Sequence, residues 1–177
     1  MTSAASPSAT NCKVYVVEHL DPELGPWSAL EYLAIAHESH RAGARFCLSS
    51  VSPALELPTE LKEAPGVLIQ QAAAEEVFAE RKGKVCLLDP GASADLRVDD
   101  GDIFDVFLFG GILGDDPPRV PLNQIPYVDD PELRLDEHES TEMPFRYIKG
   151  PDGQPVMPSG MFELIKKDSE KGVEDLF

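Results

Sequence analysis

Short apolar runs alternate with helix-like segments over the first 109 positions. Four runs rich in β-branched and aromatic residues predict strands, and they lie at residues 13–20, 45–50, 84–90 and 104–109. A helix is predicted between the first two runs, because Pro26 suits a first helical turn and Gly43 suits a helix end. After an irregular stretch with several prolines, a second helix is predicted near residues 70–83.

This alternation predicts the fold class: α/β, with a mostly parallel sheet covered by helices on both faces. In such sheets, ligands bind where loops leave the carboxyl ends of the strands. Two loops qualify, "LLDPGA" at 87–92 and "FGGILGDD" at 109–116. The glycines of the second loop let backbone amides approach a ligand, although a tight turn that needs positive φ explains them equally well.

The pattern changes after Arg119. Parallel neighbours need a crossover of about a dozen residues, usually helical, but positions 117–131 hold five prolines and no helical period. Beyond them, an extended segment is predicted at 127–135, a hairpin around Gly-Pro-Asp-Gly at 150–153, and a helix within 160–177. We expect a single domain over residues 12–177, preceded by a disordered tail at 1–11.

Composition narrows the range of partners. A formal charge of −17 disfavours direct binding to nucleic acid and would attract a basic protein, although acidic surfaces commonly just maintain solubility. No apolar run reaches the ~20 residues of a membrane span, and no secretory signal is evident. Three dispersed cysteines favour buried reduced thiols in a cytosolic or nuclear protein, and they argue against a disulfide framework or a zinc site. Of these compartments, we expect the cytoplasm.

Four segments carry a resemblance to a known family. They are "YVVEHL" with "WSALEY", then "KVCLLDPGASADL", "FLFGGILGDDPPR", and "STEMPFRYIKGPDGQPVMPSGMFELIKKDS". With them the chain resembles a family of fungal and other eukaryotic SPOUT-superfamily methyltransferases, once labelled predicted RNA methyltransferases, that methylate an arginine of a small-subunit ribosomal protein. The resemblance implies a SPOUT-like fold, S-adenosyl-L-methionine as cofactor and a basic ribosomal protein as substrate.

One part of the family pattern is absent. Between "GDDPPR" and "TEMPFRY", family members carry several tens of residues more, and the resemblance implies that those residues close a trefoil knot and form much of the cofactor pocket. The gap coincides with the missing crossover after Arg119. The sheet is therefore expected here, whereas the knot is not part of the prediction.

The resemblance also assigns site residues. It implies a cofactor pocket lined by two loops, with Leu88, Asp89 and Pro90 in the first, and Gly110, Gly111, Ile112, Leu113 and Gly114 in the second. An arginine acceptor has a pKa above about 12, so a carboxylate must hold it and help to remove a proton. The candidates are Glu18 first, then Asp115, with Glu142 as a further possibility; solvated or capping roles are the alternative for each. Arg146 could bind a cofactor carboxylate or brace the hairpin.

Two classes of function follow. The first is a protein-arginine N-methyltransferase that uses S-adenosyl-L-methionine, with RNA methylation as the less favoured enzymatic alternative. The second is a shortened, non-catalytic form that binds a basic partner through its acidic surface, motivated by the missing segment.

Overall fold

The computed structural model describes residues 12–89, 92–109, 126–137, 140–143 and 146–174. These residues form two compact units. Residues 12–23 and 35–109 belong to the first unit, and residues 24–34 together with those from 126 onwards belong to the second. The single domain over residues 12–177 stays a prediction, and the predicted tail at 1–11 lies outside the described residues.

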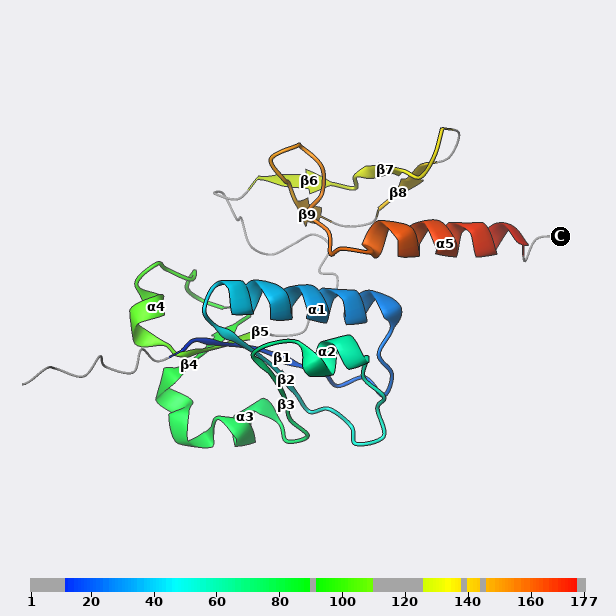
Figure 1. Cartoon of the computed structure of the whole chain (residues 1–177). Coiled ribbons are helices and arrows are strands. Elements are labelled where there is room, and N and C mark those ends of the chain that lie inside the picture. The colour runs from blue at the N-terminus through cyan, green and yellow to red at the C-terminus, as the bar shows by residue number, and fades with distance from the viewer. Residues whose placement is uncertain (1–11, 90–91, 110–125, 138–139, 144–145, 175–177) are drawn as a thin grey trace, which may run out of the picture. The chain divides into compact units, whose positions relative to one another are not determined.

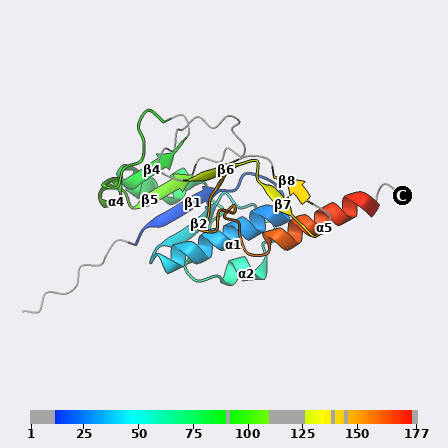
Figure 2. The same ribbon diagram turned by 90° about the horizontal axis from the view of Figure 1, so that it is seen from above.

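A five-stranded parallel sheet forms the first unit (Figures 1 and 2). Its strands are β1 (Val14–Glu18), β2 (Arg45–Ser49), β3 (Val67–Ile69), β4 (Val85–Leu88) and β5 (Val106–Phe109), in the spatial order β3-β2-β1-β5-β4. Val14 is aligned with Arg45 on one side and Val106 on the other, so neighbouring strands begin at one edge and end at the other. The predicted α/β class with a mostly parallel sheet is confirmed.

Two expectations for the connections were wrong. The stretch predicted to be irregular contains helix α2 (Thr59–Glu63) and strand β3, both too short to give a recognisable hydrophobic period. The helix predicted near 70–83 is divided into α3 (Ala74–Val77) and the 3₁₀ helix η1 (Ala79–Lys84). Between them, the buried Phe78 has non-helical backbone angles, φ −108° and ψ 21°, which place its ring in the core. Helix α4 (Asp100–Ile103) is a further short turn within an acidic run.

Successive side chains along each strand point to opposite faces of the parallel sheet, so each strand contributes apolar side chains to both faces. Val14, Val16, Cys47 and Val106 pack with Ala74 and Phe78. The side chains between them in sequence point to the other face, where the rings of Tyr15 and Phe107 lie 5.9 Å apart. Helix α1 (Pro26–Arg41) fulfils the predicted first helix and buries Ala36 and Ser39.

The second unit is built from short antiparallel ladders and one helix. Strand β6 (Tyr127–Asp129) pairs with β9 (Arg146–Ile148), and β7 (Glu132–Arg134) pairs with β8 (Ser140–Glu142). Helix α5 (Met161–Glu174) confirms the predicted C-terminal helix. The predicted hairpin is also confirmed, because Lys149 and Pro155 form an antiparallel bridge and the Gly150 amide donates to the Gln154 carbonyl at 2.7 Å.

The core of this unit is one apolar cluster: Leu133, Leu135, Met143, Met161 and Ile165. Leu30, from the first half of α1, packs against the cluster and lies 3.5 Å from the position that a Cβ atom would occupy at Gly160. Trp27, in the first turn of α1, is 36% exposed. Among the described residues, no helix combines the length and the apolar character that crossing a membrane requires.

Candidate functional site at the carboxyl edge of the sheet

Strand ends assemble the candidate site in the first unit. Val17 and Leu88 are both aligned with Phe109, and Glu18 is aligned with Ser49. Strands in a sheet lie about 4.8 Å apart, so β1 and β4, with β5 between them, end about 10 Å from each other. The structure thereby brings Glu18 to the same edge as the predicted cofactor residues Leu88 and Asp89.

Glu18 is held in a defined position at this edge. Its Oε1 atom accepts hydrogen bonds from the Ser50 hydroxyl at 2.7 Å and from the Ala74 amide at 3.0 Å. Ala74 opens α3 and Ser50 follows β2, so the carboxylate links three segments that are distant in sequence. Within the described residues, no hydrogen bond to Oε2 is recorded, and the side chain is half-buried. The carboxylate therefore has one fixed oxygen and one that no described residue holds.

Ser50 adopts an uncommon backbone conformation next to Glu18. Its φ is +58°, in the left-handed region that non-glycine residues rarely occupy. The Ser50 amide donates to Ala72 at 3.0 Å and the Val51 amide donates to Gln70 at 3.0 Å, which fixes this turn against the segment after β3. Strain of this kind persists only where the surroundings enforce it, and it occurs often at functional sites.

Two buried polar side chains lie beside this turn. The Ser49 hydroxyl is fully buried and has no hydrogen-bond partner among the described residues. His19, whose amide donates to the Ser49 carbonyl at 2.9 Å, is 4% exposed, so it is not a surface residue. The carboxyl edge thus combines a positioned acid, a strained turn and a buried unsatisfied hydroxyl.

The other predicted site residues are placed differently. Pro90, Gly110, Gly111, Ile112, Leu113, Gly114 and Asp115 lie outside the described residues. Glu142 belongs to the second unit, where it is exposed on β8 and aligned with Glu132 of β7. The catalytic and cofactor-binding assignments of all these residues stay predictions. No group of three or more His, Cys, Asp or Glu side chains in the described part of the chain is arranged to bind a metal ion.

Arg146 braces its ladder in this structure. It is aligned with Asp129 across the β6–β9 ladder, pairs with that carboxylate, and its guanidinium lies 5.7 Å from the centre of the Tyr127 ring. The hydrogen bond to Asp129 raises the pKa of Arg146 above its usual value. This arrangement fits the bracing alternative weighed for Arg146.

Ser50 and the Ala74 amide were not identified from the sequence. Neither has a local motif, because the pairing with Glu18 spans 32 and 56 positions of the chain. A backbone amide donor also leaves no trace in residue identity. Only the strand order places the three groups together.

Comparison with known proteins assigns the chain to a family. A family model described as "Protein arginine N-methyltransferase SFM1-like" matches residues 14–120 and 119–172. Protein arginine N-methyltransferase SFM1 of Saccharomyces cerevisiae is 33% identical over 215 residues, covering 92% of this chain and 98% of that protein. The chain belongs to the SFM1-like protein arginine N-methyltransferase family.

Solved structures agree with this assignment. Yeast SFM1 complexed with SAM has a TM-score of 0.72 and 31% identity, covering 90% of this chain and 92% of that chain. Yeast SFM1 complexed with SAH has a TM-score of 0.69 and 30% identity, covering 86% and 94%. The predicted family and SPOUT-like α/β fold class are confirmed.

The family match also locates the gap expected from the sequence. It falls into two parts that meet at residues 119–120. An alignment over 215 residues that uses 92% of a 177-residue chain contains about fifty positions that the yeast protein fills and this chain lacks. The break coincides with the predicted missing crossover after Arg119.

Proposed function

We propose that this chain transfers a methyl group from S-adenosyl-L-methionine to an arginine of a basic small-subunit ribosomal protein in the cytoplasm. The enzyme class and the cofactor follow from family membership and from the relatives solved with SAM and SAH. The observation that carries the mechanism is the Glu18 carboxylate, fixed at one oxygen and available at the other. The ribosomal substrate is supported by the net charge of −17, which attracts cationic proteins.

The described residues at the carboxyl edge fit such a cofactor. Leu88 and Phe109 are aligned on neighbouring strands, and Phe109 is 43% exposed, which offers an apolar surface to a purine ring. Asp89 is the residue after Leu88, and its carboxylate can accept hydrogen bonds from ribose hydroxyls. The bound cofactor supplies an activated methyl group on a sulfonium, so the protein must mainly bind, orient and exclude water.

Glu18 acts on the acceptor. A carboxylate forms charge-assisted hydrogen bonds with a guanidinium and fixes its plane. With Oε1 held by Ser50 and Ala74, Oε2 can receive the hydrogen bond from a guanidinium Nη atom and take its proton as the new N–C bond forms. Removing this proton leaves the methylated guanidinium with its single positive charge.

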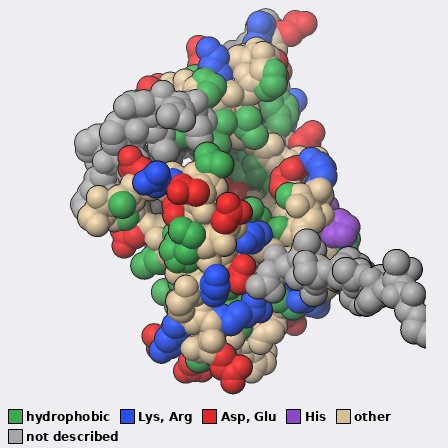
Figure 3. Space-filling view, turned by 90° about the vertical axis from the view of Figure 1, so that its left-hand side faces the viewer, with side chains coloured by type: hydrophobic (Ala, Val, Ile, Leu, Met, Phe, Trp, Pro, Cys, Tyr) green, Lys and Arg blue, Asp and Glu red, His purple; other side chains and the backbone are tan. Residues whose placement is uncertain are grey.

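The charge distribution favours a protein over RNA as substrate. Figure 3 shows one face on which acidic and hydrophobic side chains are mixed with basic ones, and several Lys and Arg side chains gather over its lower part. Phosphate-backbone binding relies on clustered Lys and Arg, and the net charge of −17 opposes it despite this group. The three free cysteines are compatible with a reducing compartment.

The deciding experiment combines binding and transfer. Calorimetric titration of the 177-residue chain with S-adenosyl-L-methionine should give saturable binding, and labelled methyl groups should appear on arginine when purified small-subunit ribosomal proteins are added. The label should be released by protease and not by nuclease. Nuclease-sensitive label would instead establish RNA methylation.

The break in the family match at residues 119–120 supports a second candidate. A chain without the intervening segment could bind the basic partner and lack the complete cofactor pocket. This non-catalytic form predicts salt-sensitive capture of a ribosomal protein by a cooperatively folded chain that binds no S-adenosyl-L-methionine. Detectable turnover would exclude it.

A further inference from the structure

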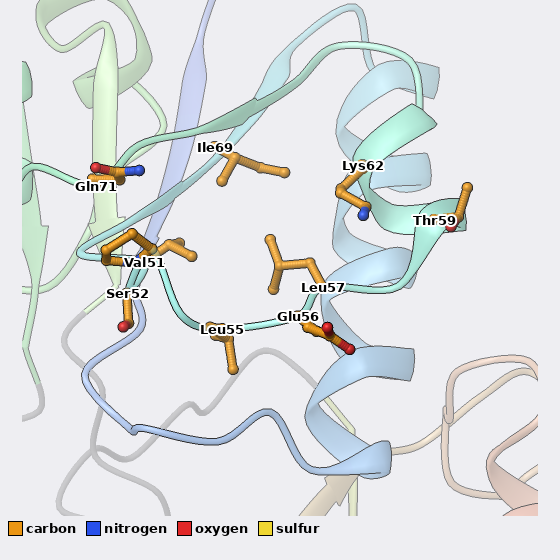
Figure 4. A pocket seen from close by; sticks show the side chains of 10 residues that line it. Val51, Ser52, Leu55, Glu56, Leu57, Thr59, Lys62, Ile69 and Gln71 are labelled. Atoms are coloured by element: carbon orange, nitrogen blue, oxygen red, sulfur yellow. The ribbon is translucent and has the colours of Figure 1, made fainter.

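A pocket of about 580 Å³ lies within the first unit, at the carboxyl ends of β2 and β3 (Figure 4). Its apolar wall comprises Val51, Leu55, Leu57 and Ile69, which converge on the cavity from the loop after β2 and from β3. Val51 and Leu57 are almost completely buried. The remaining lining residues are Ser52, Pro53, Glu56, Thr59, Lys62 and Gln71, so an apolar group would bind against the apolar wall with polar groups beside it.

The pocket is connected to the candidate active site. Ser50, whose hydroxyl binds Glu18, immediately precedes the pocket residue Val51. Backbone hydrogen bonds from Ser50 and Val51 to Ala72 and Gln70 hold the two sides of the pocket together. The pocket is therefore a formed feature of the same edge that positions the Glu18 carboxylate.

Polar groups at the rim suit a peptide backbone. Lys62 and Thr59, both on α2, are among the lining residues and can donate hydrogen bonds to main-chain carbonyls of an extended segment (Figure 4). Neither Lys62 nor Glu56, also at the rim, forms an ion pair recorded among the described residues. These charges are accessible to a ligand.

The segment that supplies the pocket residues is acidic, although the lining itself has one acidic and one basic residue, Glu56 and Lys62. Residues 51–76 contain five glutamates and a single basic residue, Lys62. A segment with several Lys or Arg residues would approach this region favourably, whereas an acidic segment would be repelled. An apolar wall within an acidic segment of the chain thus favours a basic peptide segment that carries one apolar anchor.

We propose that this pocket holds the apolar anchor residue of the basic protein segment whose arginine is presented to Glu18. This inference rests on the proposed function, because it places the acceptor arginine at Glu18. Strands β1 and β3 are separated by β2, so the two positions lie at least about 10 Å apart along the edge. An extended chain advances about 3.3 Å per residue, so the anchor lies three to six residues from the arginine.

Binding of designed peptides to the full chain tests the proposal. The probes are fluorescein-labelled 12-residue peptides of Lys, Gly and Ser with one arginine and one leucine, placed one, four or eight residues apart on either side. Fluorescence anisotropy should show that a spacing of four binds tightest, and that replacing leucine with serine weakens binding about tenfold to a hundredfold. Equal binding of the leucine and serine peptides would overturn the proposal.

A matched pair of variants locates the interaction. Leu55→Asp places a charge in the pocket and should abolish the preference for the leucine peptide. Val98→Asp adds the same charge at a fully exposed position outside the pocket and should leave the preference intact. If both variants lose the preference for the leucine peptide, or if neither does, the pocket is not the binding site of the leucine. If Leu55→Asp does not fold, the comparison of leucine and serine peptides on the unaltered chain remains the decisive test.

Cofactor titration separates this proposal from the proposed function. If the chain shows the leucine preference and the dependence on Leu55 but binds no S-adenosyl-L-methionine, the pocket assignment stands and the enzymatic function of this chain fails. If the chain methylates protein arginine without any leucine preference, the function stands and the pocket assignment fails.

Discussion

The two edges of the parallel sheet in the first unit differ in how completely their polar groups are satisfied. At the amino edge, the Lys13 ammonium donates to the Phe104 carbonyl at 2.7 Å and lies 3.3 Å from the buried Asp105 carboxylate. At the carboxyl edge, Glu18 has an oxygen that no described residue holds, Ser50 has a strained backbone, and the Ser49 hydroxyl is buried without a partner among the described residues. The groups at the first edge stabilise the fold, whereas the second edge offers a carboxylate oxygen to a ligand and carries groups that cost stability.

This difference has a simple physical basis. Buried polar groups destabilise a fold unless they are paired, so unpaired or strained groups persist where another requirement outweighs the loss. Changes to the Glu18 carboxylate should therefore affect activity more than stability, and changes to the Lys13–Asp105 pair should do the reverse.

The largest expected effect is on catalysis by Glu18→Gln. The amide oxygen of glutamine can still accept hydrogen bonds from Ser50 and Ala74, but the charge and the proton acceptor are lost. We expect kcat for arginine methylation to fall about 100-fold to 10,000-fold, with cofactor affinity and melting temperature nearly unchanged. Glu142→Gln, in the second unit, is the matched control. A larger loss of kcat in Glu142→Gln than in Glu18→Gln would identify Glu142 as the catalytic carboxylate.

Asp105→Ala should give the largest loss of stability. The substitution leaves the Lys13 ammonium without its carboxylate partner at the amino edge. We expect the free energy of unfolding to fall by about 1–3 kcal/mol, because Lys13 is partly exposed and can recover some hydration. Urea unfolding measures the change, and substitution of the exposed Asp102 by alanine serves as control. A reduced kcat in folded Asp105→Ala protein would contradict the expectation that the amino edge affects stability more than activity.

A pair of substitutions at Ser50 separates its hydrogen bond from its strain. Ser50→Ala removes the donor to Glu18 and keeps the positive φ, so the free energy of unfolding should fall by about 1–2 kcal/mol. Ser50→Gly removes the same donor but tolerates this φ, so it should be about 1 kcal/mol more stable than Ser50→Ala. Equal stability of the two variants in urea would show that the turn stores no strain.

Ser49→Ala should raise stability slightly. Removing a buried hydroxyl that lacks a partner avoids its desolvation cost, so the free energy of unfolding should rise by up to about 1 kcal/mol. Thermal unfolding of the variant and the unaltered chain measures the difference. A loss of 1 kcal/mol or more would mean that the hydroxyl does have a bonding partner.

The smallest effect at neutral pH concerns Cys47, in the middle of β2. Burial raises the pKa of its thiol to about 11, partly offset by the nearby Arg45. A thiol with a raised pKa in the folded state stabilises the protein below the unfolded-state value of 9.0 and loses this contribution as the pH rises through about 11. Unfolding free energies at pH 7.5, 9 and 10.5 should therefore decline less steeply for Cys47→Ala, and parallel curves would refute this.

Strands and long helices were the most predictable part of the fold. The runs that form β1, β2, β4 and β5 are apolar on both faces, and α1 is bounded by Pro26 and Gly43, so local pattern suffices. Strand β3 and helix α2 have three and five residues, too few for a period to be recognised. Phe78 divided the predicted helix because packing of its ring outweighed local propensity.

The amino-acid sequence alone determined the α/β class, the break after Arg119 and Glu18 as the first candidate carboxylate, because these depend on residue type and order. The family match confirmed the class and reproduced the break. Only the tertiary structure decided which donors hold Glu18, that Ser50 is strained, and that a pocket lies beside it. Each of these depends on the order of strands in the sheet, which brings together groups that are distant in sequence, and one of them is a backbone amide that no residue type reveals.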